Sequence, residues 1–276
     1  MKRRAIVASV AFLGLLSRGG SALAGGWMQD PGAFYLKLWT RSLLGSNVFL
    51  ASGQNVPAGA GYGDHALNFY TEVGLHRRWT LVAYGRPAGV AVFRGQTAFY
   101  TGDLNAGARF GLLQGTWNLA LEGHLGGTPP VGGDNLGDPA TPAVAYRPTV
   151  STLAGDLELQ LGRGVGSGGW LSGNAGLRAF TRSGLDPAVY GSAQFGWHFP
   201  VGFQFAVTVS TLQPLGAVTA TNIPGTGQTR YVGLGVDLSW WFSPRWAVTV
   251  GAATVLMAQS NAATVPLSVG IEHRGL

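Results

Sequence analysis

The side chains that most often carry out chemistry are sparse in this 276-residue chain and form no recognisable catalytic set. The chain has no cysteine, so thiol catalysis, disulfides and cysteine-ligated zinc are excluded. Its five histidines show none of the close spacings found in metal sites such as His-Glu-x-x-His. No Gly-x-Ser-x-Gly turn is present, and the glycine-rich residues 162–169 are not followed by the helix that a nucleotide loop needs. The sequence therefore predicts neither an enzyme nor a bound metal or cofactor.

Charged side chains make up only 11% of the chain, but their positions follow a regular pattern. Between residues 102 and 113, small and apolar side chains alternate with Asp103, Asn105 and Arg109, which is the period of a β-strand with two different faces. Thirteen titratable groups take the polar parity of such segments: Lys37, Arg41, Glu72, Arg86, Asp103, Arg109, Glu122, His124, Asp156, Glu158, Arg178, Asp237 and Glu272. An Arg or Lys facing lipid near the bilayer midplane costs about 2–4 kcal/mol, so we expect these groups to face a polar lumen.

These inward charges admit two interpretations. They could form a constriction that orients a solute, as rings of charge do in pores. Alternatively, acids and bases of neighbouring strands pair across the lumen and fill it, because an unpaired charge that is partly buried is costly. Aromatic residues of the same parity, among them Tyr35, Tyr70 and Tyr84, are expected mostly in the outer half, where they would stack on a solute or fill space.

Twelve segments with this alternation predict twelve strands, an even number as in single-chain bacterial barrels. They are residues 33–42, 65–75, 79–93, 101–112, 116–127, 151–162, 169–182, 188–199, 202–212, 229–242, 246–257 and 263–273. Short turns alternate with mostly longer connections, which we expect at 43–64, 94–100, 128–150, 183–187, 213–228 and 258–262. Outer-membrane barrels have short periplasmic turns and longer outer loops, so this asymmetry predicts that both chain ends lie in the periplasm.

The first 24 residues have the features of a secretory signal peptide. A basic start is followed by the apolar run 5–16 and by Ala22-Leu23-Ala24, which predicts cleavage after Ala24 and a barrel over residues 25–276. The apolar run is shorter than the roughly 20 residues that a membrane-spanning helix needs. Four of the 18 basic residues and none of the 12 acidic ones lie in this segment, which leaves the remainder with a net charge of +2. Its high pI is therefore no argument for nucleic-acid binding.

The tryptophans cluster beside the short turns. Five of them also have the parity of the apolar face, and they predict an aromatic girdle at the membrane interface: Trp79, Trp117, Trp197, Trp240 and Trp246. Trp170 and Trp241 lie beside the same turns, but with lumen parity. Outer-membrane lipid is thus an expected partner of the apolar face.

Four stretches resemble a family of outer-membrane channels grouped with the MetA pathway of phenol degradation. They are GGWMQDPGAFYLKL (25–38), NFYTEVGLHRRWTLVAYGRP (68–87), GDLNAGARFGLL (102–113) and DLELQLGRG (156–164). The resemblance implies a barrel for the passage of small, often aromatic or hydrophobic, compounds. Such barrels usually end on an aromatic residue that the barrel-assembly machinery recognises, whereas this last strand has His273 at the outward position and is followed by Arg274-Gly275-Leu276.

The leading hypothesis is a non-enzymatic outer-membrane channel for passive passage of small solutes. A structural or surface-interaction barrel with a plugged lumen is the alternative. An outer-membrane lipid hydrolase would need a Ser-His pair at the outer rim, which the sequence does not offer. A soluble, secreted β-sandwich is the remaining alternative for the fold.

Overall fold

The computed structural model describes residues 26–137 and 144–275. Its long strands are β1 (Phe34–Phe49), β2 (Asn55–His76), β3 (Trp79–Phe93), β5 (Leu104–Leu113), β6 (Trp117–Thr128), β8 (Thr152–Val165), β9 (Gly169–Phe180), β10 (Ala188–His198), β11 (Phe203–Pro214), β13 (Arg230–Trp241), β14 (Trp246–Gln259) and β16 (Leu267–Gly275). The short strands are β4 (Gln96–Tyr100), β7 (Val144–Ala145), β12 (Thr221–Asn222) and β15 (Asn261–Ala262). The predicted signal peptide and its cleavage site at Ala24 lie outside the described residues. Within the described ranges, no helix is long and apolar enough to cross a membrane.

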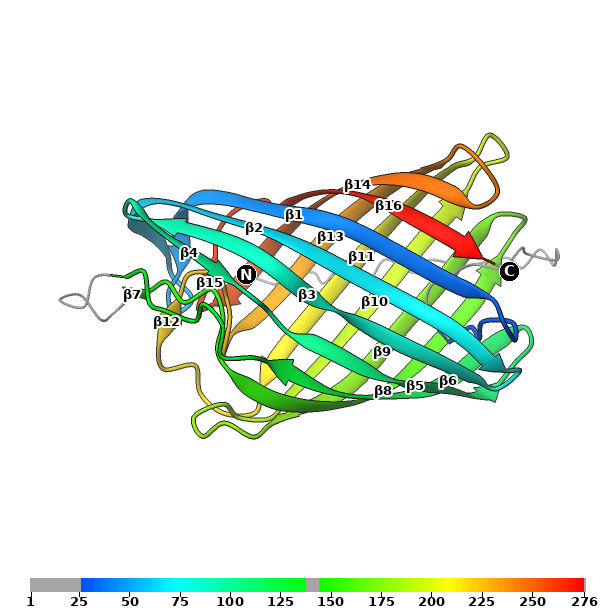
Figure 1. Ribbon diagram of the computed structural model, residues 1–276, viewed down its shortest axis with the longest axis horizontal. Coiled ribbons are helices and arrows are strands. Elements are labelled where there is room, and N and C mark those ends of the chain that lie inside the picture. Colours follow the sequence, from blue (N-terminus) through cyan, green and yellow to red (C-terminus); the bar gives the residue numbers. More distant parts are fainter. Residues whose placement is uncertain (1–25, 138–143, 276) are drawn as a thin grey trace, which may run out of the picture.

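The twelve long strands close into one antiparallel barrel (Figure 1). Each pairs with its neighbours in chain order, and β1 pairs with both β2 and β16. Lys37 of β1 therefore lies opposite Tyr70 of β2 on one side and Glu272 of β16 on the other. Closure pairs both edges of every long strand, as hydrocarbon surroundings require, because lipid tails offer the backbone no hydrogen-bond partner. The predicted twelve-stranded, all-β barrel is confirmed.

The two ends of the barrel differ. At one end, the short-turn end, lie the links β2–β3, β5–β6, β8–β9, β10–β11 and β13–β14, together with residues 26–33 and the end of β16. At the other, the long-loop end, lie residues 129–137 and 144–151 between β6 and β8 and residues 215–229 between β11 and β13. This asymmetry agrees with the sequence prediction.

The prediction of a loop over residues 43–64 is wrong. β1 continues to Phe49 and β2 begins at Asn55, so only residues 50–54 separate the two strands. The register between them shifts between Gly45 and Asn47. Because such a bulge reverses the parity of the residues beyond it, the alternation is interrupted in the sequence although the strand is not.

The predicted loop 94–100 is also mostly strand. β4 pairs back onto β3 in a hairpin whose two turn residues, Arg94 and Gly95, both have positive φ angles (50° and 75°). Two such residues in succession make the tight turn whose twist matches that of the flanking strands. An arginine at the first of these positions is not the usual Asn or Asp, so the turn is not evident from sequence.

The long-loop end carries an internal cap. β7 pairs in parallel with β12, so the two long loops hold each other. Tyr146, which follows β7, is fully buried, stacks on Phe93 at 5.2 Å and donates its hydroxyl to the carbonyl oxygen of Gly63 at 2.8 Å. Burial raises the pKa of this hydroxyl well above its ordinary value, so it remains protonated and able to donate. We call residues 144–150 and 221–226 the cap.

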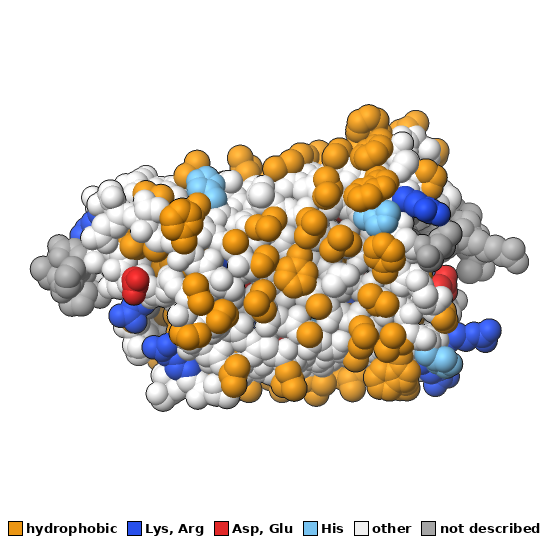
Figure 2. Space-filling view, viewed as in Figure 1, with side chains coloured by type: hydrophobic (Ala, Val, Ile, Leu, Met, Phe, Trp, Pro, Cys, Tyr) orange, Lys and Arg blue, Asp and Glu red, His pale blue; other side chains and the backbone are white. Residues whose placement is uncertain are grey.

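The outer wall is apolar. Leucine, valine and phenylalanine side chains cover the middle of the barrel surface, whereas most charges visible in this view lie towards its two ends (Figure 2). Leu125, Leu157 and Leu177, for example, are each more than half exposed. An apolar surface of this extent suits the hydrocarbon of a membrane and not water.

Candidate functional site

The lumen gathers the polar groups that the sequence predicted to share a face. All thirteen lie on the inner face of the barrel wall, and several are almost completely buried, such as Glu72 at 2% and Arg109 at 4% exposure. Burial of this degree requires partners, because an isolated buried charge costs several kcal/mol. The structure supplies them in separate groups along the lumen.

Arg109 of β5 is the centre of the group nearest the short-turn end. Its Nη2 lies 2.9 Å from Oε1 of Glu72, and its Nε pairs with Oε2 of Glu122 on the neighbouring strand β6. Glu122 also lies 2.9 Å from Nε2 of His124, and Tyr70 both donates to Glu72 and accepts from Arg109. Two carboxylates and one guanidinium are thereby held together by direct charged contacts.

The described start of the chain closes onto this group. Residues 26–33 enter the short-turn end of the lumen, where the carbonyl oxygen of Trp27 accepts from Nη1 of Arg109 at 3.0 Å. Gln29 donates its side-chain amide to Glu72 at 2.5 Å and its backbone N–H to Thr80 at 3.1 Å. We call residues 26–33 the N-terminal segment. It lies inside this end of the lumen, held by hydrogen bonds to buried side chains of the barrel wall.

Two glycines of the wall make room for the N-terminal segment. A Cβ atom on Gly162 of β8 would collide with the ring of Trp27. A Cβ atom on Gly111 of β5 would lie 3.0 Å from Cγ of Met28. Both positions thus allow an approach that larger residues would prevent. The sequence prediction missed this role of the segment. Its only signal was the opening GGWMQDPG, which entered the resemblance without a structural interpretation.

The remaining charges form pairs farther along the lumen. Arg178 and Asp156 make a two-bond pair, with distances of 2.5 and 2.8 Å, and Tyr84 contacts both. Lys37 lies 3.9 Å from both Asp237 and Glu272.

Glu272 and Glu158 accept hydrogen bonds mainly from uncharged donors. Glu272 accepts from Tyr35 at 2.9 Å and from Ser239 at 2.8 Å. Glu158 accepts from Asn174 at 2.8 Å and from Gln160. Tyr35 and Tyr70 lie towards the short-turn end and not in the outer half, and they hydrogen-bond to carboxylates. Their predicted location is wrong.

Two arginines near the long-loop end have looser partners. Nη2 of Arg41 lies 3.8 Å from Asp64, which is fully buried and accepts from Tyr100 at 2.8 Å. Nη2 of Arg86 lies 3.6 Å from Asp103. The backbone fixes this second pair, because Arg86 N–H donates to the Asp103 carbonyl oxygen at 2.8 Å beside the bulge at Pro87.

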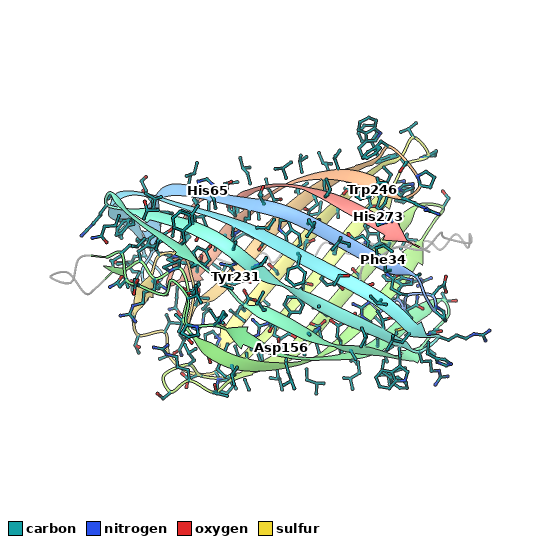
Figure 3. All side chains as sticks on the ribbon, in the orientation of Figure 1. Phe34, His65, Asp156, Tyr231, Trp246 and His273 are labelled. Carbon is teal, nitrogen blue, oxygen red and sulfur yellow. The ribbon has the colours of Figure 1, made fainter. Side chains whose placement is uncertain are left out.

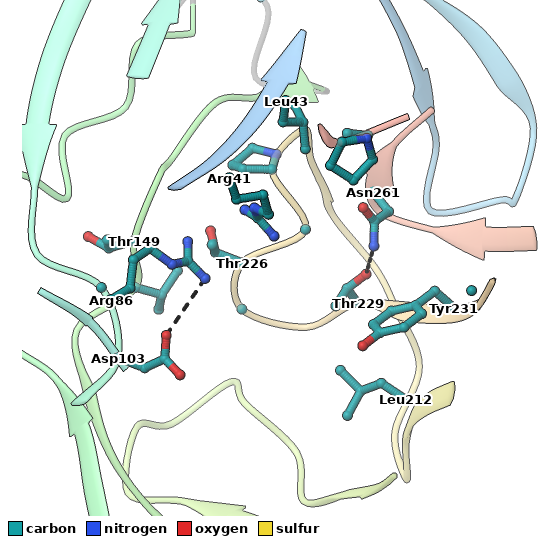
Figure 4. A pocket seen from close by; sticks show the side chains of 18 of the residues that line it. Arg41, Leu43, Arg86, Asp103, Thr149, Leu212, Thr226, Thr229, Tyr231 and Asn261 are labelled. Carbon is teal, nitrogen blue, oxygen red and sulfur yellow. Dashed lines mark hydrogen bonds and ion pairs between the residues drawn. The ribbon is translucent and has the colours of Figure 1, made fainter. Parts of the chain in front are cut away.

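Two cavities adjoin inside the lumen. The inner cavity, of about 590 Å³, lies against the Arg109 group and is also lined by Lys37, Tyr84 and Glu158. The outer cavity, of about 470 Å³, lies beneath the cap and is lined by Arg41, Arg178 and Tyr231 (Figure 4). Arg86, Asp103 and Thr208 line both. Among the described residues, no group of three His, Asp or Glu side chains could hold a metal ion.

No protein-family model and no curated protein matches the sequence. Among solved structures, the chain is similar to the COG4313 outer membrane channel from Pseudomonas putida F1, with a TM-score of 0.62 and 12% identity over 91% of this chain and 98% of that one. It is also similar to the NanC porin, with a TM-score of 0.53 and 7% identity over 86% and 98% of the two chains. The fold is that of an outer-membrane β-barrel. At these identities the likeness establishes the fold alone.

The five tryptophans of the predicted girdle lie around the short-turn end, on the outer face. Four of them (Trp79, Trp117, Trp240 and Trp246) are between 41% and 48% exposed, and Trp197 is half-buried against the turn at Gly166. Trp170 and Trp241 are buried inside: the Trp170 indole donates to Gln194 at 3.0 Å, and Arg274 lies over the Trp241 ring.

His273 occupies an aromatic site on the last strand. Its ring centroid is 4.1 Å from that of Trp246 and 5.1 Å from that of Phe34, and the three lie together at the short-turn end (Figure 3). Imidazole therefore packs here as an aromatic residue would. Leu276 lies outside the described residues.

Proposed function

We propose that the protein is a narrow channel of the bacterial outer membrane, through which small solutes pass passively. The observation that carries this proposal is the pair of adjoining cavities, which extend along a polar lumen inside a closed apolar wall. Most of the charged side chains along the lumen have a partner of opposite sign, so a solute could pass without separating a tight ion pair such as Arg109–Glu122 or Arg178–Asp156. The resemblance seen in the sequence supports small aromatic or hydrophobic compounds as the solutes.

The orientation follows from the asymmetry of the two ends. We place the short-turn end, the N-terminal segment and both chain termini in the periplasm, and the cap outside the cell. The tryptophans Trp79, Trp117, Trp197, Trp240 and Trp246 then form a girdle at the periplasmic interface, in contact with lipid headgroups. We propose that the barrel-assembly machinery recognises His273, packed against Trp246, in place of the usual terminal aromatic residue.

Conductance tests the proposal. The folded protein, purified in detergent and inserted into planar bilayers, should give a small ion current, and it should let small neutral solutes enter liposomes. Complete absence of both current and solute flux would overturn it. Folding is checked in the same preparation by heat-modifiable mobility on gels.

A barrel with a closed lumen is the second candidate, and a specific observation favours it. The N-terminal segment obstructs one end, and the cap covers part of the other. Such a barrel would serve as a structural protein or would bind partners through its long loops. If shortening the N-terminal segment and loosening the cap in one variant still gives no current, this candidate replaces the channel.

A further inference from the structure

The outer cavity carries an excess of positive groups at its surface. Among the described residues that line it, the charged ones are three arginines, Arg41, Arg86 and Arg178, and one carboxylate, Asp103. Arg41 and Arg86 come from β1 and β3, which flank β2, and Arg178 comes from β9; all three line the cavity beneath the cap. Asp64 and Asp156 partner Arg41 and Arg178 but do not line the cavity. The charged groups that a solute meets in this cavity are therefore mainly guanidiniums.

The three arginines differ in how completely their guanidinium N–H groups are hydrogen-bonded. Arg178 is committed to Asp156 through two short bonds. By contrast, Arg41 and Arg86 reach their carboxylates only at 3.8 and 3.6 Å, which is too long for a hydrogen bond, and the further partner of Arg86 is the uncharged hydroxyl of Tyr100. The Nε atoms of both are buried and have no hydrogen-bond partner among the described residues. A buried donor without a hydrogen-bond partner destabilises the protein.

The two less satisfied guanidiniums also lie in the same part of the cavity. Figure 4 shows Arg41 and Arg86 pointing into the space bordered by Thr226 and Thr149 of the long loops. Their like charges repel each other. A negatively charged group between them would relieve the repulsion and accept their free N–H groups at once.

The rest of the lining sets the size and polarity of an occupant. Leu43, Phe180 and Leu212 supply apolar surface, and Thr229 and Tyr231 supply hydroxyl groups. A volume of about 470 Å³ lies within the roughly 300–1,000 Å³ of small-molecule sites. A cation is disfavoured, because the one carboxylate among the described lining residues is already beside Arg86.

We propose that the outer cavity is a binding site for a small organic anion, a carboxylate with a compact apolar body, held between Arg41 and Arg86. This inference rests on the proposed function, since it names the class of solute that the channel would admit from outside. The carboxylate would lie against the two guanidiniums, and the apolar body against Phe180 and Leu212.

Equilibrium binding to the folded protein in detergent tests the site without any current. Calorimetric titration compares three probes: benzoate, its neutral analogue benzamide, and acetate, which has the charge but no apolar body. Benzoate should bind at least about tenfold more tightly than either of the others, since charge-assisted bonds are among the strong ones. Benzamide binding as tightly as benzoate would overturn the anion site, and equal binding of acetate would overturn the apolar body.

Variants locate the site. Arg41→Gln and Arg86→Gln should each weaken benzoate binding about tenfold or more. Arg182→Gln is the matched control, because Arg182 is an exposed residue at the same end of the barrel and does not line the cavity. Equal weakening by all three variants would overturn the assignment, leaving only a general effect of charge.

The two proposals can fail separately. Benzoate binding in a protein that gives neither current nor solute flux would support the anion site and overturn the channel. Current through a folded protein that does not bind benzoate would support the channel and overturn the site. Heat-modifiable mobility of each variant on gels shows that it is folded before either measurement is made.

Discussion

At the scale of single residues, the charged side chains of the lumen differ in how completely they are paired. Arg109 is almost fully buried and shared between Glu72 and Glu122, with Tyr70 and the Trp27 carbonyl as further partners. The sequence places these residues on one face, but their exact pairing is a matter of register. Arg109 is tightly paired, whereas Arg41 is 3.8 Å from its carboxylate. We therefore assign Arg109 a structural role and propose that Arg41 is available to a solute.

Replacing Arg109 by methionine should strongly destabilise the barrel. The substitution leaves Glu72 and Glu122 buried without their shared cation, and removing one partner of a buried pair costs about 3–5 kcal/mol. Unfolding in urea, followed by tryptophan fluorescence, measures the loss. The control is Arg77→Met in the exposed β2–β3 turn, which should change the free energy of unfolding by no more than about 0.5 kcal/mol. Equal stability of the two variants would contradict the role given to Arg109.

At the scale of elements, two segments that are not part of the barrel wall lie at the two ends of the lumen. The N-terminal segment is held by Gln29 and by the fit of Trp27 against Gly162. The cap is held by Tyr146 and by the pairing of β7 with β12. Neither contact is required by the alternation of the strands, so each can be loosened while the wall remains intact.

Gly162→Val should displace the N-terminal segment. The added side chain would occupy the position of the Trp27 ring, so the segment should leave the lumen, the current should rise and chymotrypsin should cleave after Trp27. Planar-bilayer recording and mass spectrometry of the digest measure the two effects. Gly164→Val is the matched control, because a Cβ atom on this glycine of the same strand meets nothing within 4 Å. A resistant segment and an unchanged current in Gly162→Val would refute the obstruction.

Tyr146→Ala should loosen the cap without unfolding the barrel. It removes the ring that stacks on Phe93 as well as the hydrogen bond to Gly63, whereas Tyr146→Phe removes only the hydrogen bond, worth about 0.5–1.5 kcal/mol. Backbone amides of residues 144–150 should exchange hydrogen fastest in the alanine variant, and the unfolding midpoint of the barrel should change little. The opposite order of exchange in the two variants would contradict this packing.

At the scale of the whole molecule, one property decides the environment: the apolar side of the wall faces outwards. Every long strand is paired on both edges, and the polar groups are directed into the lumen. A soluble sandwich would bury the leucines that this barrel exposes. The closed fold therefore excludes the sandwich considered from sequence.

Arginine substitutions on the outer wall should show the depth dependence of a bilayer. Leu157 lies in the middle of β8 and Leu153 near its long-loop end, and both side chains are more than half exposed on the outer face. Leu157→Arg should cost about 2–4 kcal/mol on folding into lipid vesicles, and Leu153→Arg only about 0–1 kcal/mol. Equal costs for the two variants would argue against a membrane position of the wall.

The sequence by itself determined the number of strands and the direction in which most of their side chains point. Period-two alternation is local, so Arg109 and Leu157 could be assigned to opposite faces without knowing their neighbours. It failed beyond Ser42, where the bulge between Gly45 and Asn47 reverses the parity.

Only the tertiary structure decided which acid meets which base, that residues 26–33 return into the lumen and that Arg41 and Arg86 share a cavity. These contacts join residues far apart in the chain: Arg109 and Trp27, for example, are 82 positions apart. They depend on the register of all twelve strands around the closed barrel, which no local pattern encodes.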